Sequence, residues 1–137
     1  MADAVTSQTI VDTEKRVVMK FTNLSDGNGE AAVKKVDVSA LTAHPDGTAC
    51  SQVTIDQIWY DVGGMRVLID FDASTNVAAL VLGGSAAAGN VQGHMDFRSF
   101  GGIKNNASSP TGDLDFTTSG HTNLDHYTVI LEMRKQY

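Results

Sequence analysis

Apolar and polar residues alternate along most of this chain, which predicts short β-strands, since successive side chains of a strand point to opposite faces. The two most regular segments are 65–71 and 127–133, in which every second residue is apolar. Their apolar positions are Met65, Val67, Ile69, Phe71, Tyr127, Val129, Leu131 and Met133. Both segments are therefore predicted to be strands with one face on the core.

The stretch 53–71 is predicted to form a central β-hairpin. Gly63-Gly64 separates two alternating runs, and a glycine pair allows the positive φ angles of a tight two-residue turn. The alternation slips once in the first run, which predicts a β-bulge near Asp56-Gln57. Such a bulge would turn Trp59 away from the face that carries Val53 and would place Tyr60 on it.

Five further runs predict strands at 16–21, 32–38, 77–82, 93–97 and 113–118. Lys34-Lys35 interrupts the alternation of the second run, which predicts a bulge of the kind found on edge strands. The run 77–82 is apolar at both parities and is predicted to be buried on both faces. No segment shows a helical period.

Turn signals separate these runs at intervals of roughly 8 to 15 residues, a spacing typical of β-sandwiches. We therefore expect an all-β, single-domain sandwich, most plausibly a jelly roll of eight or nine antiparallel strands. Residues 15–137 would form this domain, and residues 1–14 an extended N-terminal arm, either frayed or ordered on a neighbour. Residues 83–90 and 99–112 are predicted to be loops, and loops as long as the second are usually functional or disordered.

Composition excludes several classes of function. The 137 residues carry a net charge of −6, and the basic residues are scattered, so we expect no binding to nucleic acid. No apolar run reaches the roughly 20 residues that span a bilayer, and the N-terminus does not resemble a signal peptide, so we expect no membrane partner and no Sec export. The single cysteine, Cys50, excludes an internal disulfide and is interpreted as a small buried apolar residue.

A search for chemistry finds no catalytic constellation, no cofactor motif and no metal-ligand set. His94 and Asp96 share a strand face, and Asp125 precedes His126, but both pairs are interpreted as solvated strand surface. Asp113-Leu114-Asp115 lacks the ligand alternation of a calcium loop. Trp59 and Tyr60 could form a sugar platform, although an aromatic pair in an apolar strand is more often part of the core. We therefore expect a protein that is not an enzyme.

Nearly the whole chain resembles small virion structural proteins of marine and freshwater tailed phages, which are similar to head decoration (cement) proteins. The segments that carry this resemblance are MADAVTSQTIVD, VVMKFTNLSDGNGE with KVDVS, IWYD, MDFRSFGG with NN, TGD with FTT, and YTVILEMRKQY. The resemblance implies a jelly-roll subunit, often a trimer, that is made in the host cytoplasm. It would bind the outer surface of the capsid head and hold adjacent major capsid proteins together.

Two alternatives remain open. One is a carbohydrate-binding jelly-roll module of a virion fibre that uses Trp59, Tyr60 and a face such as that of His94 and Asp96. The other is a head–tail adaptor, which would differ mainly in its copy number. For the decoration protein, the arm and the long loop are the expected contact with the capsid protein. The candidate partner-binding residues are Val5, Ile10, Val11, Phe100, Ile103, Lys104, Asn105 and Asn106.

Overall fold

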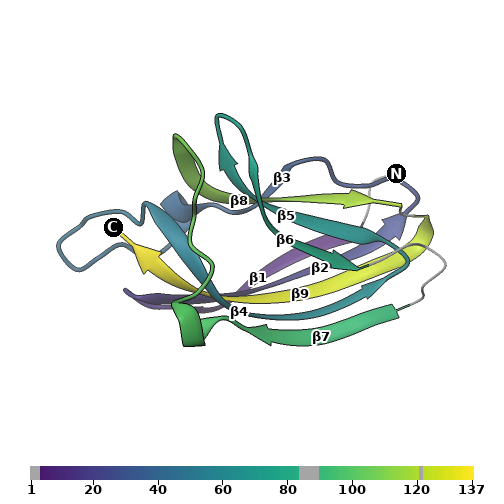
Figure 1. The fold of residues 1–137 in the computed structure, drawn as a ribbon, viewed down its shortest axis with the longest axis horizontal. Coiled ribbons are helices and arrows are strands. Elements are labelled where there is room, and N and C mark those ends of the chain that lie inside the picture. The colour runs from purple at the N-terminus through teal and green to yellow at the C-terminus, as the bar shows by residue number, and fades with distance from the viewer. Residues whose placement is uncertain (1–3, 84–89, 121) are drawn as a thin grey trace.

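The computed structural model describes residues 4–83, 90–120 and 122–137, which form nine strands in two layers (Figure 1). The strands are β1 Ala4–Asp12, β2 Arg16–Asp26, β3 Val33–Val36, β4 Gln52–Gly63, β5 Arg66–Ala73, β6 Val77–Gly83, β7 Asn90–Asp96, β8 Pro110–Ser119 and β9 Asn123–Gln136. Single 3-10 turns lie at Val38–Ala40 and Arg98–Phe100. Every predicted strand is present, and most of them extend beyond the range that the alternation marks.

The strand order is that of a jelly roll, as predicted. One sheet has the order β1-β2-β9-β4-β7 and the other has the order β3-β8-β5-β6, and all neighbours are antiparallel. The pairs β2–β9, β3–β8, β4–β7 and β5–β6 nest inside one another along the chain. A long antiparallel ribbon folded over itself gives this pairing, and β1 is added at the outer edge.

The core lies between the two sheets and uses the predicted apolar faces. All eight apolar positions of the segments 65–71 and 127–133 are buried, together with Val17, Met19 and Phe21 of β2. Aromatic rings join the layers, since Phe21 of one sheet meets Phe116 of the other edge-to-face at 5.1 Å between ring centroids. Side-chain alternation is thus the direct cause of the sandwich.

The predicted central hairpin is wrong. β4 and β5 belong to different sheets, and the chain crosses between the layers at Gly63-Gly64. Gly63 continues β4, where it pairs with Asn90 and His126, and Gly64 takes a φ of +79° as the chain leaves the sheet. Two strands with one apolar face each can lie side by side or pack face to face, and here they pack face to face.

The prediction that the run 77–82 is buried on both faces is also wrong. β6 is an edge strand in which only Leu82 is fully buried, and Val81 is 64% exposed. An apolar run at both parities does not by itself identify a central strand, because the position in the sheet decides what covers the outer face.

Both predicted bulges are confirmed. The register of β4 against β9 shifts between Ile55 and Gln57, which directs Tyr60 inward against the core and leaves Trp59 on the outer face. The register of β3 against β8 shifts at Lys34-Lys35, and β3 is an edge strand. A slip in alternation therefore located both irregularities correctly.

The two segments predicted as irregular are more ordered than expected. Residues 4–12 of the predicted arm form β1, which pairs with β2 along its length. The predicted loop 99–112 begins within a 3-10 turn, its Ile103 forms a bridge with Ile55, and its last three residues belong to β8. Most of the other predicted loop, 83–90, lies outside the described residues. The boundary at residue 14 stays a prediction.

Candidate functional site

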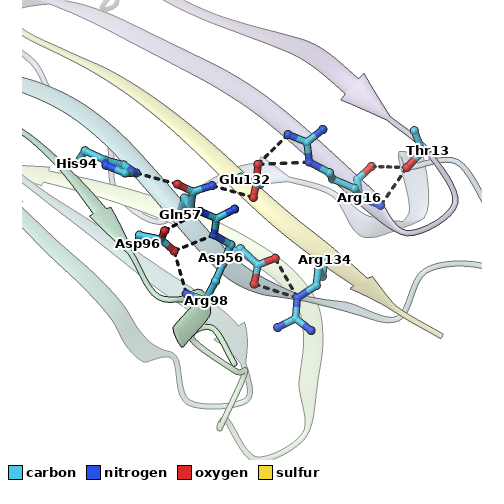
Figure 2. Close-up of polar contacts among 9 residues, drawn as sticks. All are labelled: Thr13, Arg16, Asp56, Gln57, His94, Asp96, Arg98, Glu132 and Arg134. Carbon is cyan, nitrogen blue, oxygen red and sulfur yellow. Dashed lines mark hydrogen bonds and ion pairs between the residues drawn. The ribbon is translucent and has the colours of Figure 1, made fainter. Parts of the chain in front are cut away.

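The outer face of the five-stranded sheet carries a row of polar side chains that crosses four strands (Figure 2). Arg16 of β2 donates to Glu132 Oε2 of β9 at 2.7 Å, and Gln57 Nε2 of β4 donates to Glu132 Oε1 at 3.0 Å. His94 Nε2 of β7 lies 2.8 Å from Gln57 Oε1. These side chains meet because the bulge in β4 brings Gln57 onto the outer face opposite Glu132.

This row fixes the imidazole of His94. Glu132 is a carboxylate and accepts from both neighbours, so the Gln57 amide must present its oxygen to His94. His94 Nε2 is therefore the donor in that bond. Burial alone would raise the pKa of Glu132, but hydrogen bonds from Arg16 and Gln57 outweigh it, and the pKa lies below its usual value.

The fixed imidazole of His94 stacks on the indole of Trp59, with ring centroids 4.9 Å apart and planes within 10° of parallel. Trp59 and His94 are cross-strand partners, and Trp59 keeps 36% of its surface exposed. An exposed indole supported by a second flat ring forms an apolar wall on an otherwise polar face.

An open pocket of about 520 Å³ lies beside this wall. Three strands line it, and its residues are Trp59, Tyr60 and Asp61 of β4, Gln92, Gly93 and His94 of β7, and Thr128 and Ile130 of β9. The volume is in the range of small-molecule sites, and so is the combination of an aromatic wall with a few polar groups. This pocket is the candidate ligand site.

The structure does not join the sequence-predicted pair His94 and Asp96. Asp96 instead forms an ion pair with Arg98 at 2.7 Å, and hydrogen bonds from Arg98 lower the pKa of the exposed Asp96 carboxyl to about 2. Asp125 likewise accepts from the backbone and hydroxyl of Thr122. Neither pair has the geometry of an acid–base couple, which agrees with the solvated-surface interpretation.

The structure also bears on the other features considered in the sequence, which are the single cysteine, a metal site and a membrane span. Cys50 is buried, as predicted, and burial raises the pKa of its thiol, which makes it a poor nucleophile. In residues 4–83, 90–120 and 122–137, no group of three or more His, Cys, Asp or Glu side chains is placed to hold a metal ion. No helix of the same residues is long and apolar enough to cross a membrane. His121 lies outside the described residues.

A second candidate surface is the free edge of β1. Val5 is 43% exposed, Ile10 is 49% exposed and Val11 is half-buried, so the strand keeps apolar side chains at the surface. Its last residue is anchored to the domain, because Asp12 forms an ion pair with the fully buried Lys135 ammonium and accepts from the Thr42 backbone.

The remaining predicted partner-binding residues lie after β7, at the opposite edge of the same sheet. Phe100 is 64% exposed, whereas Ile103 is half-buried and packs against the core. Lys104 and Asn106 are exposed and Asn105 is half-buried. The structure thus does not bring the two predicted partner-binding segments together. Their role stays a prediction.

Sequence reasoning found Trp59, Tyr60 and His94 but missed Asp61, Gln92 and Thr128. These three residues belong to separate strands and meet only through the cross-strand register, in which Asp61 lies opposite both of the others. Their polar character at outward positions was visible in the sequence. Their adjacency was not, because it depends on which strands are neighbours.

No family model matches the chain, and no curated protein does. Among solved structures, a point mutant of the carbohydrate-binding module CBM29-2 matches with a TM-score of 0.34 and 8% identity, over 96% of this chain and 91% of that one. A family 29 carbohydrate-binding module matches with a TM-score of 0.33 and 8% identity, over 96% and 88%. Similarity at this level supports no conclusion about ligand or function.

Proposed function

We propose that this protein is a non-catalytic structural subunit of a phage particle. It binds the major capsid protein on the outside of the assembled head and stabilises the contacts between shell subunits, as a decoration protein does. The resemblance along nearly the whole chain to virion proteins of this kind motivates the proposal. The observation that carries it is the uncharged free edge of β1, which is regular over residues 4–9.

β1 is built to accept another chain. It is the longest edge strand among the described residues, and positions 4–11 contain no charged residue and no proline. Edge strands that must stay single usually carry lysine, proline or a bulge. β3 has both a bulge and Lys34-Lys35, whereas β1 has one irregularity, between Thr9 and Val11, and pairs regularly with β2 over residues 4–9. An extended segment of the shell protein could add to β1 through main-chain hydrogen bonds, with Val5 and Ile10 packing against its side chains.

The exposed Phe100 supports a second contact at the far edge of the sheet. Aromatic side chains are enriched at the centres of protein interfaces, and Phe100 sits on a short 3-10 turn that the Ile55–Ile103 bridge holds in place. With contacts at both edges, one subunit would touch two neighbouring shell proteins. A trimer would multiply these contacts by symmetry.

The stabilisation would follow from mass action. A subunit that binds only the assembled shell stabilises it by about 2.7 kcal/mol per site at a free concentration of about 100 times Kd. Many modest contacts repeated around a head are then sufficient to resist internal pressure, and no catalytic step is needed.

The test compares particles with and without this protein under heating and osmotic shock. We expect particles that lack it to release DNA at lower temperature and to regain resistance when purified protein is added. Equal resistance of both particles would refute the decoration role.

A second candidate function is carbohydrate binding by a virion fibre module, which the pocket beside Trp59 favours. An aromatic wall next to carboxylate, amide and hydroxyl groups matches the mixed apolar and polar surface of a sugar. A glycan array probed with the wild type and with Trp59→Ala tests this candidate. It predicts binding that Trp59→Ala abolishes, and binding that survives the substitution would exclude this pocket.

A further inference from the structure

Asp61 is one of the residues that line the pocket. It lies on the outer face of β4, one outward position beyond Trp59, and its cross-strand partners are Thr128 of β9 and Gln92 of β7. The carboxylate is thus framed by a hydroxyl and an amide, and the Trp59–His94 stack closes one side.

One oxygen of Asp61 lacks a hydrogen-bond partner among the described residues. Asp61 Oδ1 is shielded from solvent, yet neither Thr128 nor Gln92 donates to it. Buried polar atoms are almost always paired, and a buried acceptor without a donor typically costs about 1–3 kcal/mol, more when it is charged. The Asp61 carboxyl as a whole is half-buried and lines the pocket, so a ligand there can donate to its accessible oxygen and offset part of this cost, because the two oxygens share one negative charge.

The negative charge of Asp61 limits the class of ligand that the pocket can bind. Among the residues that the structure describes, Asp61 is the only carboxylate that lines the pocket, and no lysine or arginine lines it. An anionic group in the pocket would meet a carboxylate with no cation to offset it. A neutral ligand that donates hydrogen bonds would satisfy Asp61 without this repulsion.

We propose that the pocket binds a neutral sugar unit of a glycan, with Asp61 as the residue that determines specificity. The Trp59 indole stacks on the apolar face of the sugar ring, and hydroxyl groups of the sugar donate to the Asp61 carboxylate. Sugars that carry a carboxylate are rejected. This inference rests on the second candidate function.

Trp59 makes the pocket directly observable, because it is the only tryptophan of the chain. Its emission is recorded while the protein is titrated with neutral oligosaccharides built from glucose, galactose or mannose, and separately with oligosaccharides of uronic acids. The same titrations are made with Asp61→Asn, which preserves shape and removes the charge. Asp70→Asn, on the outer face of the other sheet, is the matched control.

We expect neutral sugars to change the Trp59 emission of the wild type and uronic acids to leave it unchanged. Asp61→Asn should weaken neutral-sugar binding by at least about tenfold, the effect of one lost hydrogen bond to a charged group, and should reduce the discrimination against uronic acids. Asp70→Asn should behave as the wild type. Thermal unfolding of Asp61→Asn should occur at about the temperature of the wild type, because Asp61 Oδ1 has no hydrogen bond to lose among the described residues.

Three outcomes would contradict the proposal. Neutral-sugar affinity and selectivity that Asp61→Asn leaves unchanged would refute the role of Asp61, while the carbohydrate site itself would stand if Trp59→Ala abolished binding. Preference of the wild type for uronic acids would refute the assigned class of ligand. Failure of every sugar to bind at millimolar concentration would refute the second candidate function together with this inference.

Discussion

At the scale of single residues, the stability of this protein depends on carboxylates whose surroundings shift their pKa in opposite directions. Glu132, in the polar row of the outer face, is held ionised by Arg16 and Gln57. Asp115, on the outer face of the other sheet, has its pKa raised to about 6 by burial and by the neighbouring carboxyl of Asp72. These two groups should give opposite dependences of stability on pH.

Glu132→Gln should lower the free energy of unfolding by about 1–2 kcal/mol at pH 7, because it weakens the hydrogen bonds from Arg16 and Gln57. The folded-state pKa of Glu132 lies below the ordinary value of 4.5, so its contribution is complete above that pH and is lost as the pH falls through the folded-state pKa. Denaturant titrations at pH 7 and at about pH 3 measure the difference, which should narrow in acid. A difference that stays constant with pH would contradict this assignment.

Asp115→Asn should act in the opposite direction. Burial and the Asp72 charge raise the pKa of Asp115 from 3.8 to about 6, so the folded state binds the proton more tightly than the unfolded state. Stability is therefore lost as the pH rises from about 4 to about 6 and stays reduced above that range, so the substitution should raise stability at pH 8 by about 1 kcal/mol. Thermal unfolding at pH 8 and at pH 4 checks this, with the gain expected only at the higher pH. A gain at both values would point to a packing effect instead.

At the scale of elements, the sequence predicted which residues face the core better than it predicted which strands are neighbours. Every apolar position that the alternation marks in the segments 65–71 and 127–133 is buried, and the slip near Asp56 correctly predicted that Trp59 faces outward. Alternation reports only that one face of a strand is apolar. It therefore did not reveal that the chain changes sheet at Gly63-Gly64, nor that β6 lies at an edge.

For the candidate site too, the sequence showed the residue types but not which strands bring them together. Trp59 and His94 were visible as residue types, but the stack between them and the pocket beside them arise from the pairing of β4 with β7. The free edge of β1 was also hidden, because an uncharged N-terminal segment is typical of a mobile arm and of an edge strand alike. Which strands are neighbours, and which edge is free, depends on pairing between residues far apart in the chain. A single sequence does not show this pairing.

The β1 edge gives a prediction at this scale. The double substitution Val5→Lys with Ile10→Lys should leave the fold intact, because both side chains are substantially exposed, and its stability should change by less than about 1 kcal/mol. It should nevertheless reduce binding to phage heads by at least about tenfold, since charged side chains protect an edge from strand addition. Sedimentation of the variant with heads that lack the protein measures this.

The matched control is Val33→Lys with Val81→Lys, which places the same charges at exposed positions on the edge strands β3 and β6 of the other sheet. This variant should bind heads as the wild type does. Equal losses in both double variants would show that added positive charge, rather than the β1 edge, weakens binding.

At the scale of the whole molecule, the fold separates two surfaces with different chemistry. The edge of β1 is uncharged at residues 4–11 and exposes Val5 and Ile10, whereas the pocket beside Trp59 lies across β4, β7 and β9 near the other edge of the same sheet. The pocket is lined by β4, β7 and β9 on the face of the sheet, so contacts made at the two edges, through β1 and Phe100, would leave it open. The decoration role and a glycan site are therefore compatible in one particle, and each can be removed without the other.

The subunit stoichiometry tests the central claim, that this protein decorates the capsid head, most directly. Purified particles are resolved on a gel, and the amount of this protein is quantified against the major capsid protein. A decoration protein repeated by the symmetry of the shell predicts on the order of hundreds of copies per particle, at a simple ratio to the capsid protein. About a dozen copies would contradict the account and would indicate a head–tail adaptor or a tail component, and absence from the particle would exclude every virion role.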